Sequence, residues 1–259
     1  MPTVGEIDKV LSLAAPKELS ESWDNDGVMF CSHANATVNK ALVALDATDA
    51  AVSFAADNGF DCIVTHHPFI FSPLSRINSD VYGIFKILMD AGISVLSYHT
   101  RMDSAVGGVN DCLAEILNLN NIAAFGGESG NIGRVGELSE QMSPEEFANF
   151  LKEKLHCGNI RAAYFDDENK KIKRVAVVGG GGKSFLYEAF CAGADAFVTS
   201  EAAHNTFYDA KKLGMCVYDC GHYYTENQIC RRFEQILKDN FGDSLEVYSF
   251  DTGSPYINI

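Results

Sequence analysis

The chain lacks several features that would assign it to a class at once. Its eight cysteines include no CxxC pair, which argues against structural zinc on thiolates and favours reduced thiols in a cytosolic protein. No apolar run approaches the roughly 20 residues that cross a bilayer, and the N-terminus reads as an amphipathic helix, not a signal peptide. Basic residues are few, 20 Lys and Arg against 35 Asp and Glu, and the formal net charge is −15. We therefore expect a cytoplasmic protein without a membrane or nucleic-acid partner.

What the chain does contain is an internal duplication. The stretch Val43–Thr65 aligns without a gap with Val177–Thr199, which begins 134 residues later. Six positions coincide: Val43 with Val177, Ala55 with Ala189, Gly59 with Gly193, Asp61 with Asp195, Val64 with Val198, and Thr65 with Thr199. A second matched pair, Gly92–His99 and Gly214–His222, follows at a spacing that is twelve residues shorter, because the first half has a longer loop after its histidines.

Each half reads as strand, helix, strand, helix, strand. We expect strands at 40–46, 61–65, 93–98, 173–178, 196–199 and 215–219, and helices at 50–58, 81–91, 109–117, 185–191 and 205–213. Near-continuous apolar strands that alternate with helices predict mainly parallel sheets covered on both faces. In such sheets, sites form outside the carboxyl ends of the strands. The sequence therefore predicts an α/β protein with two interlinked, internally duplicated domains and a metal site between them.

The glycine-rich loop 126–130 is the predicted domain boundary. It divides the chain into a first α/β domain, 1–125, and a second, 126–259. Between the repeats we expect a short strand at 133–138, a helix from a capping box at 143–146 to about 155, a strand at 159–165 and a solvated turn at 166–171. The alternating tail, 244–250, predicts a strand that returns to a sheet, with the first domain as the candidate.

Imidazole and carboxylate groups follow the predicted strands. His66 and His67 come directly after one strand, and Pro68 restricts the backbone there, so that the usual alternation can break and both rings can converge. His222 and Glu226 are four residues apart at the start of a helix and lie on one face of it. Asp103 follows His99 by four residues. These groups predict a metal site.

Ligand chemistry narrows the choice of metal. Imidazole and carboxylate without thiolate suit zinc, iron or manganese better than magnesium or calcium. Five candidate ligands exceed what one catalytic ion needs, and a carboxylate can bridge two ions, so we expect two divalent ions per chain. Such a pair would lower the pKa of bound water and provide hydroxide at neutral pH.

Four ordered motifs carry a resemblance to a known family. They are Asp24-Asn25-x-Gly27, Thr65-His66-His67-Pro68, His99-x-x-x-Asp103 followed by Gly107-Gly108-Val109-Asn110-Asp111, and Gly221-His222-x-x-x-Glu226. With the closing Asp251-Thr252-Gly253-Ser254-Pro255, the set resembles the Nif-three-like proteins over nearly the whole chain. Bacterial members are catalogued as GTP cyclohydrolase I type 2 homologues. Arg101 and Met102 depart from the residues usual in that family.

The resemblance implies two interlinked α/β domains, a dinuclear centre and a ring-shaped homohexamer. It implies that His66, His67, Asp103, His222 and Glu226 are the metal ligands. The nominal reaction is hydrolytic opening of the GTP purine ring by metal-bound hydroxide, and the substrate is a small molecule such as a nucleotide. His99 and Glu201 are the candidate catalytic groups for proton transfer. Two alternatives stay open, a non-catalytic metal-binding regulatory or scaffold protein and a metal-dependent phosphohydrolase.

Three further signals are weaker. Gly179–Ser184 imitates a P-loop, but its first glycine is missing, so a tight strand-to-helix turn is favoured, with backbone N–H groups that could still hold an anion. His204, like Glu201, either lines the site or makes a domain or subunit contact. Trp23 is interpreted as a packing anchor in preference to a base-stacking platform.

Overall fold

The computed structural model describes residues 1–31, 35–164 and 170–257. They form two compact units. The first contains Met1–Met102 and Ile229–Pro255, and the second contains Asp103–Gln228 with the end of the chain from Tyr256. The turn predicted at 166–171 lies mostly outside the described residues.

The first unit is built on a five-stranded mixed sheet in the order β1-β4-β3-β2-β11. Its strands are β1 (Gly27–Phe30), β2 (Lys40–Ala44), β3 (Cys62–Thr65), β4 (Ser94–Ser97) and β11 (Glu246–Ser249). Three of the four pairings are parallel, and only β1 runs antiparallel, along β4. The tail strand expected at 244–250 is thus the edge strand β11.

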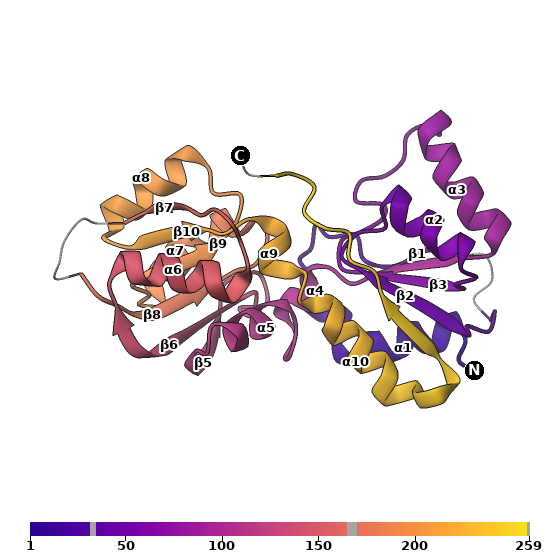
Figure 1. The fold of residues 1–259 in the computed structure, drawn as a ribbon, viewed down its shortest axis with the longest axis horizontal. Helices are drawn as coiled ribbons and strands as arrows, with labels where there is room; N and C mark the ends of the chain where they lie inside the picture. Colours follow the sequence, from indigo (N-terminus) through magenta and orange to yellow (C-terminus); the bar gives the residue numbers. More distant parts are fainter. Residues whose placement is uncertain (32–34, 165–169, 258–259) are drawn as a thin grey trace. The chain divides into compact units, whose positions relative to one another are not determined.

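Helices cover both faces of the first sheet (Figure 1). They are α1 (Val4–Ala14), α2 (Asp49–Asp57), α3 (Ser79–Ala91) and α10 (Ile229–Phe241). On one face, α2 and α3 pack their apolar side chains against Leu42, Ile63 and Val95. On the other face, α1 and α10 lie side by side. The short helix α4 (Thr100–Ser104) follows β4 and contains the point at which the chain passes into the second unit.

The second unit is built on a six-stranded sheet in the order β5-β6-β8-β9-β10-β7. Its strands are β5 (Asn120–Phe125), β6 (Gly133–Met142), β7 (Arg161–Ala163), β8 (Ile172–Val177), β9 (Ala196–Thr199) and β10 (Cys216–Asp219). Only the β8-β9 and β9-β10 pairings are parallel, and the other three are antiparallel. The prediction of mainly parallel sheets is therefore wrong for this unit, because the β5-β6 hairpin and the edge strand β7 add antiparallel pairs.

Alternation along the central strands separates the two cores of the second unit. Val175 and Val177 face a core with α5 (Val109–Ile116) and α6 (Pro144–Leu155), whereas Ala176 faces a core with α7 (Leu186–Cys191) and α8 (His204–Leu213). Figure 1 shows α6 and α8 on opposite sides of the strands. The last helix of this unit, α9 (His222–Glu226), follows β10.

The duplication read in the sequence is present in the strand register. Val43 lies opposite Val64 in the first sheet, and Val177 lies opposite Val198 in the second. The next pairing, shifted by twelve residues, also repeats, since Thr65 lies opposite Ser97 and Thr199 lies opposite Asp219. The two halves are therefore copies of one supersecondary unit.

The duplication extends further than the sequence alignment showed. The antiparallel edge strands correspond, because Gly27 lies opposite Ser97 and Arg161, 134 residues after Gly27, lies opposite Asp219. Each edge strand is preceded by a helix with a complete capping box, at Thr3 in α1 and at Ser143 in α6. Sequence identity is too low in these segments to reveal the relation.

The duplicated aspartates have the same structural role. Asp61 accepts hydrogen bonds from the backbone N–H groups of Asn39 and Lys40, at 2.7 and 3.1 Å. Asp195 accepts from those of Lys173 and Arg174, at 3.0 and 2.9 Å. In each repeat this carboxylate binds the start of the neighbouring strand, which is why an acidic residue recurs there.

The compact units divide the chain at 102/103, and not at the expected 125/126. Helix α5 and strands β5 and β6 follow the first repeat but belong to the second unit, where Leu113 and Ala114 are buried in the core. Conversely, α10 and β11 follow the second repeat and belong to the first unit. The segment that follows the first repeat thus belongs to the second unit, and the segment that follows the second repeat belongs to the first unit.

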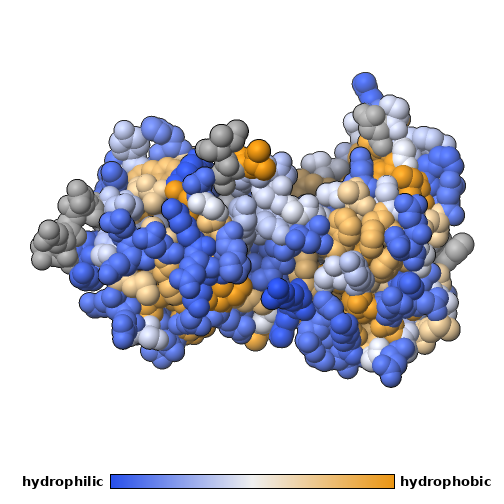
Figure 2. Space-filling model, viewed as in Figure 1, coloured by the Kyte–Doolittle hydropathy of each residue, from blue (hydrophilic) through white to orange (hydrophobic). Residues whose placement is uncertain are grey.

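Helix α10 was not expected from the sequence, although Ile229, Phe233 and Leu237 are four residues apart and all are buried. This apolar spacing was a usable signal. None of the helices within the described ranges combines the length and hydrophobicity needed to cross a membrane. The face in Figure 2 is largely hydrophilic, with hydrophobic side chains interspersed. No disulfide joins any of the eight cysteines, all of which lie among the described residues.

We predict that Asp61→Ala and Asp195→Ala each lower the free energy of unfolding by about 1–3 kcal/mol, because each removes a charged acceptor from two strand-initiating N–H groups. Chemical denaturation measures the change. Asp57→Ala, at an exposed position at the end of α2, is the control and should change stability little. Equal stability of all three variants would contradict the shared role.

Candidate metal centre

Three histidines gather at the carboxyl ends of β3 and β4 in the first unit. One ring nitrogen of each of His66, His67 and His99 lies within 4.8 Å of the others. The rings of His66 and His67 have centroids 5.0 Å apart, so the two side chains converge despite their adjacent positions. His66 is completely buried, while His67 and His99 are partly exposed. This burial gradient suits a cluster that opens on one side.

Each of these rings is oriented by an oxygen at Nδ1. For His66 it is the carbonyl oxygen of Tyr98, at 2.9 Å. For His67 and His99 it is a carboxylate oxygen, of Asp46 at 2.7 Å and of Asp24 at 2.8 Å. Because a carbonyl or an ionised carboxylate can only accept, Nδ1 carries the proton and the lone pair of the neutral ring is on Nε2. Histidines that bind a metal through Nε2 have this tautomer, with the Nδ1–H group donated to a carbonyl or carboxylate oxygen.

Asp24 is the most firmly held of these carboxylates. Its Oδ2 accepts from the backbone N–H and the hydroxyl of Thr100, at 2.9 and 2.6 Å, while Oδ1 accepts from His99. Burial opposes ionisation, but the hydrogen bonds from His99 and Thr100 outweigh it and lower the pKa of Asp24 to about 2. Asp24 is therefore ionised at neutral pH and fixes His99.

A second set of groups lies in the second unit, at the ends of β8, β9 and β10. His222 Nε2 is 2.8 Å from Oε2 of Glu226 one turn along α9, and its Nδ1 is 2.7 Å from Oε1 of Glu201. Glu226 is buried, whereas Glu201 is mostly exposed. Glu201 has a left-handed backbone, with φ of 53°, two residues after the end of β9. Its carboxylate orients His222 as Asp24 orients His99.

The glycine-rich loop after β8 encloses the Glu226 carboxylate. A Cβ at Gly180 would overlap Oε1 of Glu226 and would come within 3.1 Å of His222 Nε2. Gly180 also has a φ of +60°, which favours glycine. Any side chain here would displace the carboxylate.

Three N–H groups of the same loop are engaged within the protein. The N–H of Gly179 donates to Asn110 Oδ1 at 2.8 Å, that of Gly180 donates to Thr225 Oγ1 at 3.1 Å, and that of Gly182 donates to the Gly180 carbonyl at 2.9 Å. These contacts argue against the expectation that successive N–H groups of the loop hold an anion.

Asp103 is the first residue of the second unit and is 9% exposed. The segment after it is held by Asn110, which donates to the Ile132 carbonyl at 2.7 Å, and by Arg134, which donates to the carbonyls of Ser104 and Ala105 at 3.1 Å. A carboxylate oxygen of Asp103 lies within 4.8 Å of one of Glu226. Two buried carboxylates at this separation favour a bound cation.

Sequence reasoning missed the groups that orient the rings. Asp46 lies two residues after β2, at the same sheet edge as His67, and Asp24 belongs to the Asp24-Asn25-x-Gly27 motif. The position of Asp46 and the motif around Asp24 were therefore usable signals. The run of four glycines at 179–182 was a usable signal for the close backbone approach at Gly180. No local pattern showed which histidine each carboxylate contacts.

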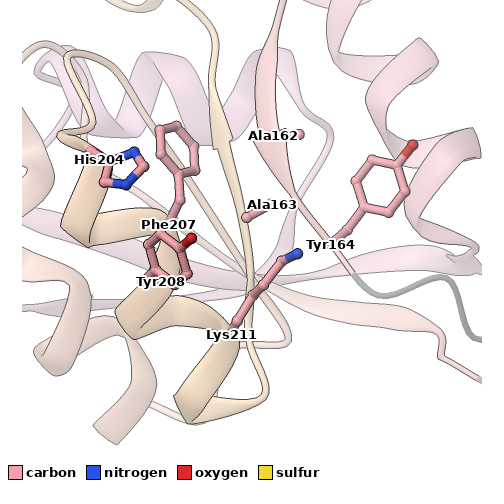
Figure 3. A pocket seen from close by; sticks show the side chains of 7 residues that line it. All are labelled: Ala162, Ala163, Tyr164, His204, Phe207, Tyr208 and Lys211. Atoms are coloured by element: carbon pink, nitrogen blue, oxygen red, sulfur yellow. The ribbon is translucent and has the colours of Figure 1, made fainter.

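Two cavities lie in the second unit. One, of about 290 Å3, has Glu201, Arg161, Asp219, Tyr224 and Tyr256 in its wall and adjoins the His222 contact. The other, of about 380 Å3, lies between β7 and one face of α8 (Figure 3). His204 lines this second cavity together with Phe207, Tyr208 and Lys211, and its ring lies 5.1 Å from that of Tyr208. His204 thus lines a different cavity from Glu201.

Comparisons with known proteins agree with this fold. The family model of Duf34/NIF3 (NGG1p interacting factor 3) matches residues 2–255. A Clostridium perfringens protein named GTP cyclohydrolase 1 type 2 homolog is 33% identical over 98% of both chains.

Among solved structures, reduced HcgD from Methanocaldococcus jannaschii is similar, with a TM-score of 0.84, 30% identity, and coverage of 96% of this chain and 97% of that one. A Bacillus cereus protein related to NIF3 has a TM-score of 0.88 at 23% identity, covers 100% of this chain and 99% of its own, and supports the fold. The chain belongs to the DUF34/NIF3 family.

Proposed function

We propose that the protein is a dinuclear metal hydrolase that acts on a small molecule, with His66, His67, Asp103, His222 and Glu226 holding two divalent ions. The observation that carries the proposal is the chemistry of the donors. The first unit offers imidazoles whose Nδ1 atoms are held by oxygens, and the second offers two buried carboxylates within 4.8 Å of each other. Histidines oriented in this way are typical metal ligands. Two buried carboxylates so close together are unfavourable unless a cation compensates their charge.

The donor set selects among metals. Imidazole and carboxylate without thiolate favour zinc, iron or manganese. Bound divalent ions would supply Lewis-acid activation of water and substrate. His222 has a carboxylate at each nitrogen, and a cation in place of the shared Nε2 proton would satisfy both the ring and Glu226, as would a proton on the ring or on Glu226.

The chain's own residues would position these groups and transfer protons. Asp46 and Glu201 fix the rings of His67 and His222, and the ionised Asp24 fixes His99. His99 is our candidate proton acceptor, because it lies in the imidazole cluster and is partly exposed. The exposed Glu201 orients His222 and lines the 290 Å3 cavity, which has the size of a small-ligand site.

The nominal substrate follows from relatives. The Clostridium perfringens relative is named a GTP cyclohydrolase 1 type 2 homolog, and on that ground we propose hydrolytic opening of the GTP purine ring. Because a shared fold does not by itself transfer chemistry, this reaction is the first to test. Cysteines without disulfides among the described residues are typical of a reducing compartment, and we propose the cytoplasm.

The metal proposal predicts about two divalent ions per chain after metal-replete purification. Glu226→Ala should reduce occupancy strongly, because it removes a buried ligand. Glu201→Ala should weaken metal binding by roughly ten- to a hundredfold, because it removes only the partner of Nδ1. Elemental analysis and metal titration measure both effects, with the exposed Glu188→Ala as control. Fewer than one ion per wild-type chain would refute the proposal.

The catalytic proposal predicts a separable role for His99. His99→Ala should retain most of the metal while slowing turnover of a purine nucleotide by roughly a hundredfold or more, as loss of a general base does. Turnover and metal content are measured on the same preparation. Loss of metal together with activity would make His99 a ligand. Metal-loaded wild-type protein without turnover on any nucleotide would favour a scaffold role.

We also propose a homohexamer, which the resemblance of the motifs implies. Light scattering at micromolar concentration should then give about six times the chain mass of 28.2 kDa. A stable monomer would overturn this assembly and would leave the metal proposal unaffected.

A further inference from the structure

Two large aromatic side chains beside the histidine cluster are exposed. Trp23, the only tryptophan in the chain, is 58% exposed, and Phe71 is 56% exposed. The interpretation of Trp23 as a packing anchor is wrong, because more than half of its surface stays accessible. Exposed aromatic rings that touch a candidate site are typical of ligand contacts.

The two rings lie directly against His99. Trp23 and Phe71 have ring centroids 6.0 Å apart and planes inclined at 51°, so they do not cover each other face to face. Both meet the His99 ring edge-on, with centroid distances of 6.1 and 6.3 Å and angles of 75° and 80°. The His99 ring is also 5.3 Å from that of His66, between centroids. A molecule on the aromatic pair would therefore lie next to a member of the imidazole cluster.

The loops that carry the two rings are held in place. Asp24, next to Trp23, is fixed by His99 and Thr100. Asn25 donates from its side chain to the carbonyl of Ile70, the residue before Phe71. The backbone beside both aromatic residues is thus fixed by hydrogen bonds, which lowers the entropy cost of ordering these loops when a ligand binds.

We infer that Trp23 and Phe71 form a stacking platform for a planar heteroaromatic ring, such as a purine base, and hold it against His99. The location as a substrate subsite rests on the proposed function, whereas the stacking itself does not. A planar ring gains dispersion and π contacts from the two apolar faces, while the neighbouring imidazoles provide polar contacts to its edge. A ligand without a planar ring gains none of the stacking.

Because Trp23 is the only tryptophan, its fluorescence reports on the platform directly. Guanosine and ribose 5-phosphate are titrated into metal-loaded and metal-free protein, with excitation at the red edge of the tryptophan band, where neither probe absorbs. We expect saturable quenching by guanosine and none by ribose 5-phosphate. Phe71→Ala should weaken guanosine binding by about ten- to a hundredfold, the usual effect of one stacked base.

The matched control is Tyr187→Ala on α7, an aromatic residue that is 64% exposed and lies 6.3 Å from another ring, that of Phe190. This variant should bind guanosine as the wild type does. Trp23→Ala, followed by calorimetry, should lose binding while keeping its metal content. Equal quenching by ribose 5-phosphate, or no effect of Phe71→Ala, would overturn the platform.

Two further outcomes separate competing explanations. If Trp23 emission changes with protein concentration in the absence of probe, a second copy of the chain covers the pair, and the platform is refuted. If guanosine quenches Trp23 but no nucleotide is turned over, the platform stands and the hydrolase proposal fails.

Discussion

The exchange of terminal segments between the two repeats is the constraint on which the rest of the structure depends. Each repeat supplies three parallel strands and their helices, but the strand that extends its sheet beyond β2 or β8 comes from the end of the other repeat, as β11 and β6 do. The helices that precede them, α10 and α5, bury Phe233 and Leu113 in the receiving core. Without this exchange, each sheet would lose the strand beyond β2 or β8 and one of the two helices that cover one of its faces.

The site shows what duplication followed by divergence can produce. The two copies retain the same register and the same strand-initiating aspartate, but the groups after their strands differ. The first copy carries His66 and His67 after β3, whereas the second carries Ser200 and Glu201 after β9. At these equivalent positions one repeat therefore carries two imidazoles, and the other carries a hydroxyl and a carboxylate. Divergence at equivalent strand ends is a simple way to obtain a mixed set of side chains from one duplicated fold.

The sequence was a good guide where local chemistry decides the structure. Gly92 and Gly214 end α3 and α8 in the left-handed conformation, as glycine after an apolar helix predicts. The strand ends that carry the histidines were also placed correctly. The fold class was correct, and the error lay in the antiparallel strands of the second sheet. Contacts between distant segments, such as Asp24 with His99 or Asn110 with Gly179, have no local signature and could not be read from the chain. The exposure of Trp23 belongs with these, since burial depends on the whole fold.

The position of α10 and β11 near the end of the chain has a consequence for how the protein is made. During synthesis, N-terminal domains generally fold first, as soon as they are complete. The first unit cannot do so, because its sheet lacks β11 and its core lacks Phe233 until the second repeat has already emerged. The first sheet must therefore wait with an open edge beside β2 while the second unit forms. The main segment of the second unit, Asp103–Gln228, is therefore synthesised before the first unit has all of its strands.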